Sequence, residues 1–142
     1  MRPRSIVMFE RLFLTSLVLS VVVFVMSYET SIAQLERMPE VTQLGIGSGV
    51  WTGAFLFGLA LYLLLWFLIA RKASKVAKWI LIVFIALGLI ALAGELNGPW
   101  DLVLILNVAV YAAQVGGVVY LFQDDAVAWL NGEWNTDTTP FD

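Results

Sequence analysis

The sequence SGVWTGAFLFGLALYLLLWFLIA, residues 48–70, contains no charged residue and is long enough to cross a lipid bilayer. The hydrocarbon core of a bilayer is about 30 Å thick, which takes roughly 20 apolar residues of α-helix. Three further stretches meet this requirement, at residues 9–28, 78–96 and 101–122. Because backbone groups in lipid must be hydrogen-bonded within their own segment, each stretch is expected to be helical. The sequence therefore predicts an all-α integral membrane protein whose four transmembrane helices form a bundle.

The composition of the chain excludes several classes of function. Hydrophobic residues make up 61% of the 142 residues and charged residues 13%, whereas soluble domains average about 25% charged. The chain contains neither Cys nor His, so thiol chemistry, haem ligation and imidazole-mediated proton transfer lack the residues they use. Ionisable residues near mid-bilayer would mark transport or proton relay, and none is expected there. We therefore expect a non-enzymatic protein with no cofactor, no nucleic-acid partner, and the lipid bilayer around it.

Basic residues near the ends of the spans indicate an orientation. Three arginines lie in the first eleven residues, and four Lys or Arg residues lie between the second and third spans, whereas the other two loops hold only Arg37. Lys and Arg favour the cytoplasmic side, so we predict a multi-pass membrane protein with both termini, including the tail 123–142, in the cytoplasm. A signal peptide cleaved near Ala33 is the alternative. Glu10 and the length of the apolar run favour a retained first span.

An amphipathic segment follows the first span. Ile32, Leu35 and Met38 recur every three residues with polar residues between them, and Pro39 follows. This spacing predicts that the first helix continues beyond the bilayer and ends at the proline. Its apolar face would then rest on lipid, on a loop or on another protein.

Two shorter signals concern the cytoplasmic side. Ser74 precedes the third span and is a typical N-cap residue. In the tail, Asp124 and Asp125 are typical of a helix start and Gly132 of a helix end, with apolar residues between them. The tail is therefore predicted to contain one short helix at the membrane interface.

Two rows of small residues are spaced four apart, as in transmembrane helices that pack closely. They are Gly45, Gly49 and Gly53 at the start of the second helix, and Ala109, Ala113 and Gly117 in the fourth. Lipid provides little hydrophobic force between helices, so close backbone contact through small residues matters more than in water. The two rows predict either a compact four-helix bundle within one chain or contact between chains.

The fourth span also carries a polar face. Asn107, Tyr111 and Gln114 are spaced i, i+4 and i+7 and therefore lie on one side of the helix. Ser16 and Ser20 of the first helix are expected at the depth of Gln114. Because an amide exposed to lipid is costly, the first interpretation is that the amides hydrogen-bond across the bundle to the first helix. The alternative is a polar binding site or pore lining.

Three sequence segments carry a resemblance to known proteins. They are RPRSIVMFERLFLTSLVLSVV (2–22), LLLWFLIARKASKVAKWILIVFIALGL (63–89) and YLFQDDAVAWLNG (120–132). Together they resemble a group of small uncharacterised bacterial four-helix inner-membrane proteins. The resemblance is one of pattern over most of the chain. It implies a four-helix membrane fold and supplies no catalytic residue and no activity.

Two functions follow as hypotheses. The first is an interaction protein, either an accessory or assembly subunit of a larger inner-membrane complex or a homo-oligomer. The second is a small oligomeric transporter or channel, with Asn107, Gln114 and Glu10 along its path. An intramembrane enzyme would have to use the oxygen ligands of the loop 95–101, which suit a hard cation but are more simply a solvated turn.

Overall fold

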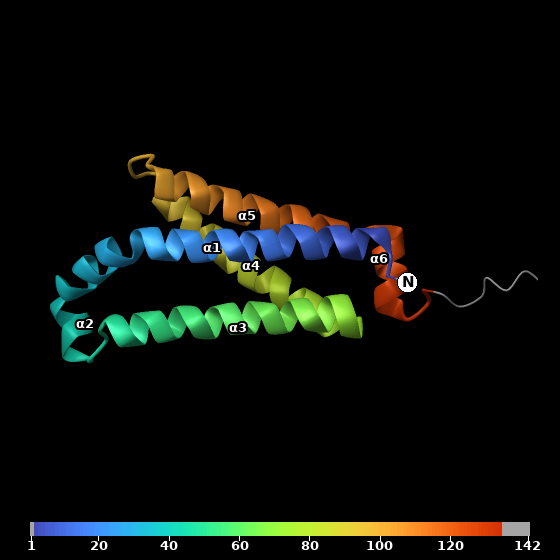
Figure 1. Cartoon of the computed structure of the whole chain (residues 1–142), viewed down its shortest axis with the longest axis horizontal. Coiled ribbons are helices and arrows are strands. Elements are labelled where there is room, and N and C mark those ends of the chain that lie inside the picture. Colours follow the sequence, from blue (N-terminus) through green and yellow to red (C-terminus); the bar gives the residue numbers. More distant parts are fainter. Residues whose placement is uncertain (1, 135–142) are drawn as a thin grey trace, which may run out of the picture.

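The computed structural model describes residues 2–134, which form six α-helices (Figure 1). The helices are α1 (Arg4–Glu36), α2 (Pro39–Gln43), α3 (Ser48–Lys72), α4 (Lys75–Glu95), α5 (Leu102–Tyr120) and α6 (Asp124–Asn131). Four of them, α1, α3, α4 and α5, are long and apolar enough to cross a membrane. The described residues contain no strand. The predicted fold class, an all-α membrane bundle with four spans, is confirmed.

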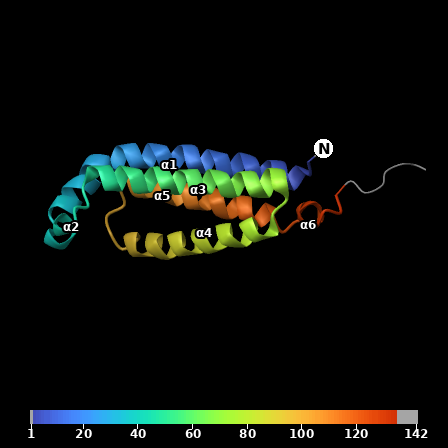
Figure 2. The same cartoon turned by 90° about the horizontal axis from the view of Figure 1, so that it is seen from below.

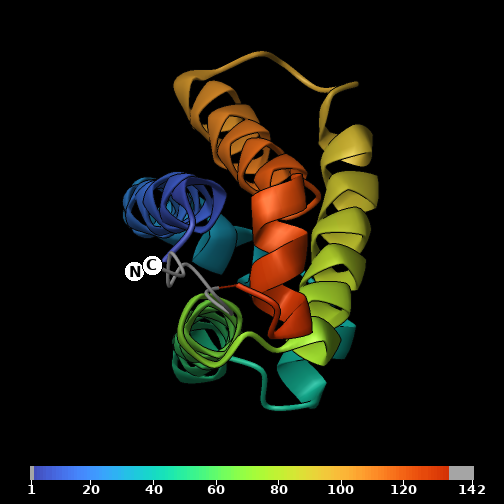
Figure 3. The ribbon, with the colours of Figure 1, turned by 90° about the vertical axis from the view of Figure 1, so that its right-hand side faces the viewer.

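The four long helices are packed unequally. The contact between α1 and α5 is the most extensive, while α3 touches α1 and α4, and α4 touches α5 more sparsely. Figures 2 and 3 show α4 on the opposite side of the bundle from α1. Seen along the bundle in Figure 3, α6 lies across one end of the long helices, between α1 and α4. We call this the α6 end, and the opposite end, which carries α2, the α2 end.

The first predicted span is extended at both ends in the structure, and a separate short helix follows it. Helix α1 is continuous to Glu36, so the amphipathic segment does prolong the first helix. Pro39 follows the end of α1 and is also the first residue of α2. At this position the missing N–H of proline costs no hydrogen bond. The predicted N-cap of α4 is confirmed, since Ser74 Oγ accepts a hydrogen bond from the Ala77 N–H at 3.2 Å.

The hydrophobic core lies mainly at the α6 end. Phe9 and Phe13 of α1 are fully buried and stack on each other with ring centroids 5.3 Å apart. Phe13 also stacks on Tyr62 of α3 at 5.9 Å. Ile69 of α3 and Leu81 of α4 are fully buried in the same cluster. These side chains join three of the four long helices near the end where the chain begins.

Helix α6 is docked onto this core. The short helix expected in the tail is confirmed, and it ends at Gly132, whose φ of 76° is favourable for glycine. Ala126 and Leu130 are buried, and the Trp129 indole N–H donates to the Ile69 carbonyl at 3.4 Å. The part of the predicted tail at 135–142 lies outside the described residues.

Glu10 pairs with two arginines at the α6 end. Its carboxylate forms an ion pair with Arg2, and its other oxygen lies 3.8 Å from the Arg71 guanidinium. The pairing with Arg71 links the start of α1 to the end of α3, so Glu10 joins two helices rather than facing a path through the bundle.

Candidate functional site

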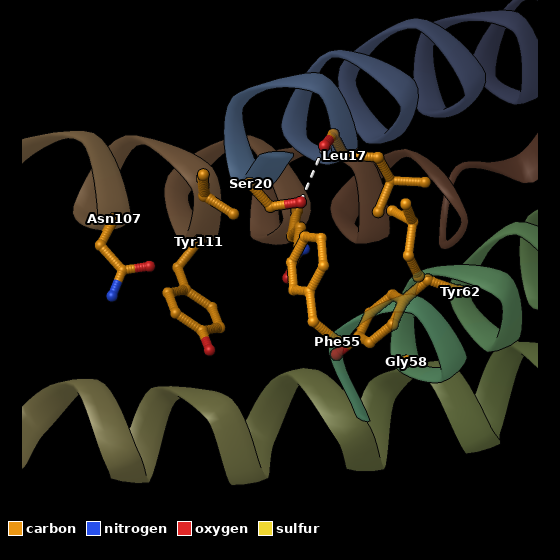
Figure 4. A pocket seen from close by; sticks show the side chains of 10 residues that line it. Leu17, Ser20, Phe55, Gly58, Tyr62, Asn107 and Tyr111 are labelled. Atoms are coloured by element: carbon orange, nitrogen blue, oxygen red, sulfur yellow. Dashed lines mark hydrogen bonds between the residues drawn. The ribbon is translucent and has the colours of Figure 1, made fainter. Parts of the chain in front are cut away.

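A cavity of about 210 Å³ lies between α1, α3 and α5 and is partly open to the exterior of the bundle. Its wall includes Ser20, Tyr62, Asn107, Tyr111 and Gln114, so three of the five come from the predicted polar face of α5. Figure 4 shows Asn107 and Tyr111 extending from α5, with Phe55 and Tyr62 reaching in from α3. The structure therefore brings the polar residues of α5 together with aromatic rings around one space.

Gln114 is the most enclosed polar residue of this wall. The residue is only 5% exposed, and its Oε1 atom has no hydrogen-bond partner among residues 2–134. A buried polar atom without a partner costs about 1–3 kcal/mol. The expectation that this amide bonds to a serine of the first helix is wrong for the structure as described.

The two serines of the first helix bond to carbonyls of their own helix. Ser16 Oγ donates to the Phe13 carbonyl at 2.6 Å, and Ser20 Oγ donates to the Leu17 carbonyl at 2.7 Å. Both bonds follow the local side-chain-to-backbone pattern that Ser adopts within helices. Ser16 is fully buried, whereas Ser20 belongs to the cavity wall. Each hydroxyl hydrogen is thus already used.

Asn107 does hydrogen-bond to another helix of the bundle, but its partner lies on α4 and not on the first helix. Its Nδ2 atom donates to Glu95 Oε2 at 3.0 Å, which ties α5 to the end of α4. In the same loop, Asp101 Oδ1 accepts from the Leu104 N–H at 2.8 Å and caps α5. The acidic residues of this loop therefore serve helix ends and the Asn107 amide. No group of three or more potential metal-ligating residues occurs in the described part of the chain.

Tyr111 occupies space that a glycine provides. A Cβ atom added to Gly88 of α4 would lie 2.5 Å from the Tyr111 ring and from its hydroxyl oxygen. The tyrosine can therefore approach α4 only because residue 88 has no side chain. Sequence reasoning missed this contact, although a glycine within an apolar transmembrane helix allows close approach of a neighbour.

The two rows of small residues have different surroundings. A Cβ added to Gly117 would lie 3.4 Å from the Phe9 ring of α1, while Ala113 is half-buried and Ala109 exposed. Gly49 and Gly53 are exposed, with no atom within 4 Å of an added Cβ.

One residue of the first row lies outside the helix on which it was expected. Gly45 precedes α3, which begins at Ser48, and it has a φ of 70°. This left-handed conformation belongs to the turn after α2 and favours glycine. The helical part of the first row is therefore reduced to Gly49 and Gly53.

Comparison with known proteins adds no relative. No protein-family model matches the chain, and no curated protein and no solved structure matches it. The resemblance to small bacterial four-helix membrane proteins therefore stays a prediction. The chain is an all-α protein with four helices suited to cross a membrane and a partly polar cavity between three of them.

Proposed function

We propose that this protein is a non-enzymatic interaction protein of the bacterial inner membrane, an accessory or assembly subunit that packs against a larger complex or against copies of itself. The observation that carries the proposal is the outward face of α3. Gly49 and Gly53 lie on that face in open space, and Phe57, one turn further on, is 72% exposed. A row of small residues with nothing against it is suited to close contact with another transmembrane helix.

The distribution of basic residues supports a cytoplasmic location for both termini. The Arg71 guanidinium lies near Glu10 of α1, so the basic α3–α4 connection and the basic N-terminus meet at one end of the bundle. Lys and Arg near span ends favour the cytoplasmic side. Cysteines introduced at exposed Asn131 and exposed Thr42 would test this, because the chain has no other cysteine. An impermeant maleimide should label intact cells only at Thr42→Cys.

Crosslinking in native membranes tests the interaction itself. A single cysteine at Gly53, in an otherwise cysteine-free chain, is labelled with a maleimide that carries a benzophenone. On irradiation the excited ketone should insert into a C–H bond of a neighbouring helix and form a covalent adduct, whether or not that helix has a thiol. Ile90→Cys on α4 is the matched control, since Ile90 is 71% exposed and lies outside the small-residue row. An adduct of twice the chain mass would identify a homo-oligomer, and a different mass a second subunit. A lone monomer with no adduct at Gly53→Cys would refute the proposal.

The cavity favours a second function, a small oligomeric transporter or channel. Its wall holds Asn107 and Gln114, as that hypothesis requires. Glu10 does not belong to the wall and is paired with arginines at the α6 end. The test is flux in proteoliposomes, where Gln114→Leu and Asn107→Leu should abolish transport while the helical content stays unchanged. Loss of folding in both variants would favour a structural role for the amides.

A further inference from the structure

We propose that the cavity beside Gln114 binds a neutral, lipid-soluble molecule that carries a hydroxylated ring, of the size of a substituted phenol. This proposal concerns the space between α1, α3 and α5, whereas the proposed interaction concerns the outward face of α3. The two can therefore fail separately.

The unpaired amide of Gln114 supplies the first argument. Its Oε1 atom is enclosed and has no partner among residues 2–134. The Ser20 hydroxyl of the same wall donates to a carbonyl of α1, as does the Ser16 hydroxyl. Buried polar groups in folded proteins are almost always hydrogen-bonded, and this oxygen is available to accept a hydrogen bond from a donor bound in the cavity. A hydroxyl group both donates and accepts, and it therefore complements either end of an amide.

The rest of the wall is mixed in polarity. Asn107 donates to Glu95, and Ser20 donates to its own helix. Tyr62 and Tyr111 also present hydroxyl groups to the wall. Much of the remaining wall is apolar, including Leu17, Phe55 and Val110. A mostly apolar molecule with one hydroxyl matches both parts of this wall.

Size and shape favour a single ring. A cavity of about 150 Å³ lined by apolar side chains is known to hold benzene, so 210 Å³ accommodates one ring and a short substituent. The rings of Phe55, Tyr62 and Tyr111 form part of the wall. Aromatic pairs prefer offset-stacked or edge-to-face contact, which rings from two helices can offer to a ring between them.

Charge and access narrow the class of ligand. No Asp, Glu, Lys or Arg belongs to the described wall, so nothing balances an ionic ligand in this low-dielectric space. The cavity is partly open, and the helices around it are of membrane-spanning length. A ligand can therefore enter from the hydrocarbon and keep any further apolar part in the lipid.

Fluorine NMR on the full chain in lipid nanodiscs provides the test. The probe is 4-(trifluoromethyl)phenol, and its matched control is 4-(trifluoromethyl)anisole, which has nearly the same shape but cannot donate. Partition into lipid is measured with empty nanodiscs. We expect saturable binding of the phenol and about tenfold weaker binding of the anisole, as one buried hydrogen bond would give. Equal binding of both probes, or no saturable binding, would overturn the proposal.

Two variants distinguish the contribution of the Gln114 amide to binding from that of the cavity volume. Gln114→Leu should weaken phenol binding to the level of the anisole. Gly58→Leu should abolish binding of both probes, because Gly58 lines the cavity and an added Cβ meets no atom within 4 Å. Gly94→Leu, on α4 in open space and outside the cavity wall, is the control and should bind both probes as the native chain does. Unchanged phenol binding in Gly58→Leu would show that the site lies elsewhere and refute the assignment, even if Gln114→Leu does not fold.

Discussion

The two ends of the bundle are built differently. At the α6 end, side chains from α1, α3, α4 and α6 form one buried cluster, and the Glu10 carboxylate pairs with Arg2 and Arg71. At the α2 end, contact between α1 and α3 depends on stacking of Phe24 on Phe55, at 3.9 Å, and on one hydrogen bond from Thr52 to Tyr28, at 3.3 Å. Helices in lipid gain little from burying apolar side chains, so the less packed end costs less than it would in water.

The cavity lies between the densely packed α6 end and the sparsely packed α2 end. The Phe13–Tyr62 contact joins its wall to the core, and the Phe24–Phe55 stack lies on its other side. Strong packing at one end fixes the direction of the helices, and sparse packing at the other end allows space between them. The comparison therefore predicts that equivalent substitutions have unequal effects at the two ends.

The largest difference is expected for two phenylalanines of α1. Phe13→Ala should lower the free energy of unfolding by about 3 kcal/mol, near the low end for Phe truncation in a core because lipid still surrounds the unfolded helices. Phe24→Ala removes one stacked pair at a half-buried site and should cost about 1 kcal/mol. Reversible unfolding by SDS in mixed micelles measures both. Equal losses would contradict the idea of a rigid α6 end and a weaker α2 end.

A second comparison introduces leucine at Gly117, which faces α1, and at Gly53, which is in open space. Gly117→Leu should cost about 1–3 kcal/mol, because the new side chain would press on Phe9 and separate α1 from α5. Gly53→Leu should change the unfolding of the single chain by less than about 0.5 kcal/mol, since the site is open. The same SDS titration measures the unfolding. Sedimentation should show that only Gly53→Leu, with its fold intact, loses the proposed association.

These glycines show how far sequence reasoning reaches. Spacing of four residues marked Gly53 and Gly117 equally, but the direction in which each helix face points depends on the other helices. Hydropathy predicted the four spans because it depends on residues close together in the chain. The contact of Tyr111 with Gly88 joins two helices, so periodicity within either helix could not predict it.

Sequence reasoning predicted which residues share a face of the candidate site but not which residues they contact on other helices. The i, i+4, i+7 spacing correctly places Asn107, Tyr111 and Gln114 on one face, and all three belong to the cavity wall. The predicted hydrogen bond from Gln114 to a serine of α1 was wrong, because Ser20 has a carbonyl of its own helix within reach. A serine in a helix always has this local alternative, and only the distance to the facing helix decides between the two.

A smaller effect is expected at Lys78 of α4. Its Nζ atom donates to the Leu121 carbonyl at 3.1 Å and lies 3.8 Å from the centroid of the Phe122 ring. A cation at a helix C-terminus and over an aromatic face stabilises by about 1–2 kcal/mol, so Lys78→Met should lose about that much in the SDS titration. Lys75→Met, at an exposed position of the same helix, is the control. A similar loss in both variants would assign the effect to surface charge.

The smallest effect concerns the docking of α6 and its dependence on pH. Asp125 Oδ2 accepts from the Ser5 N–H at 3.1 Å, so the carboxylate serves a backbone donor at the start of α1. Burial alone would raise the pKa of Asp125, but hydrogen bonds from Ser5 and Ala126 outweigh it and hold the pKa below its ordinary value. A lowered pKa means that the contribution is complete above the unfolded value, about 3.9, and is lost as the pH falls through the folded value.

Loss of this contribution should loosen α6 without unfolding the bundle. A spin label on a single cysteine at Val127 reports the mobility of α6, since the chain has no native cysteine. In the native background the label should keep its mobility from pH 6 to about 4 and gain mobility as the pH falls further toward about 2. Asp125→Asn should cost about 1 kcal/mol, as loss of a helix cap does, and should show raised mobility that no longer changes with pH. Asp124→Asn, at the exposed neighbour, should keep the native pH response. If it abolished that response instead, the attachment of α6 would depend on the net charge of its first turn and not on the bond that Asp125 makes to α1.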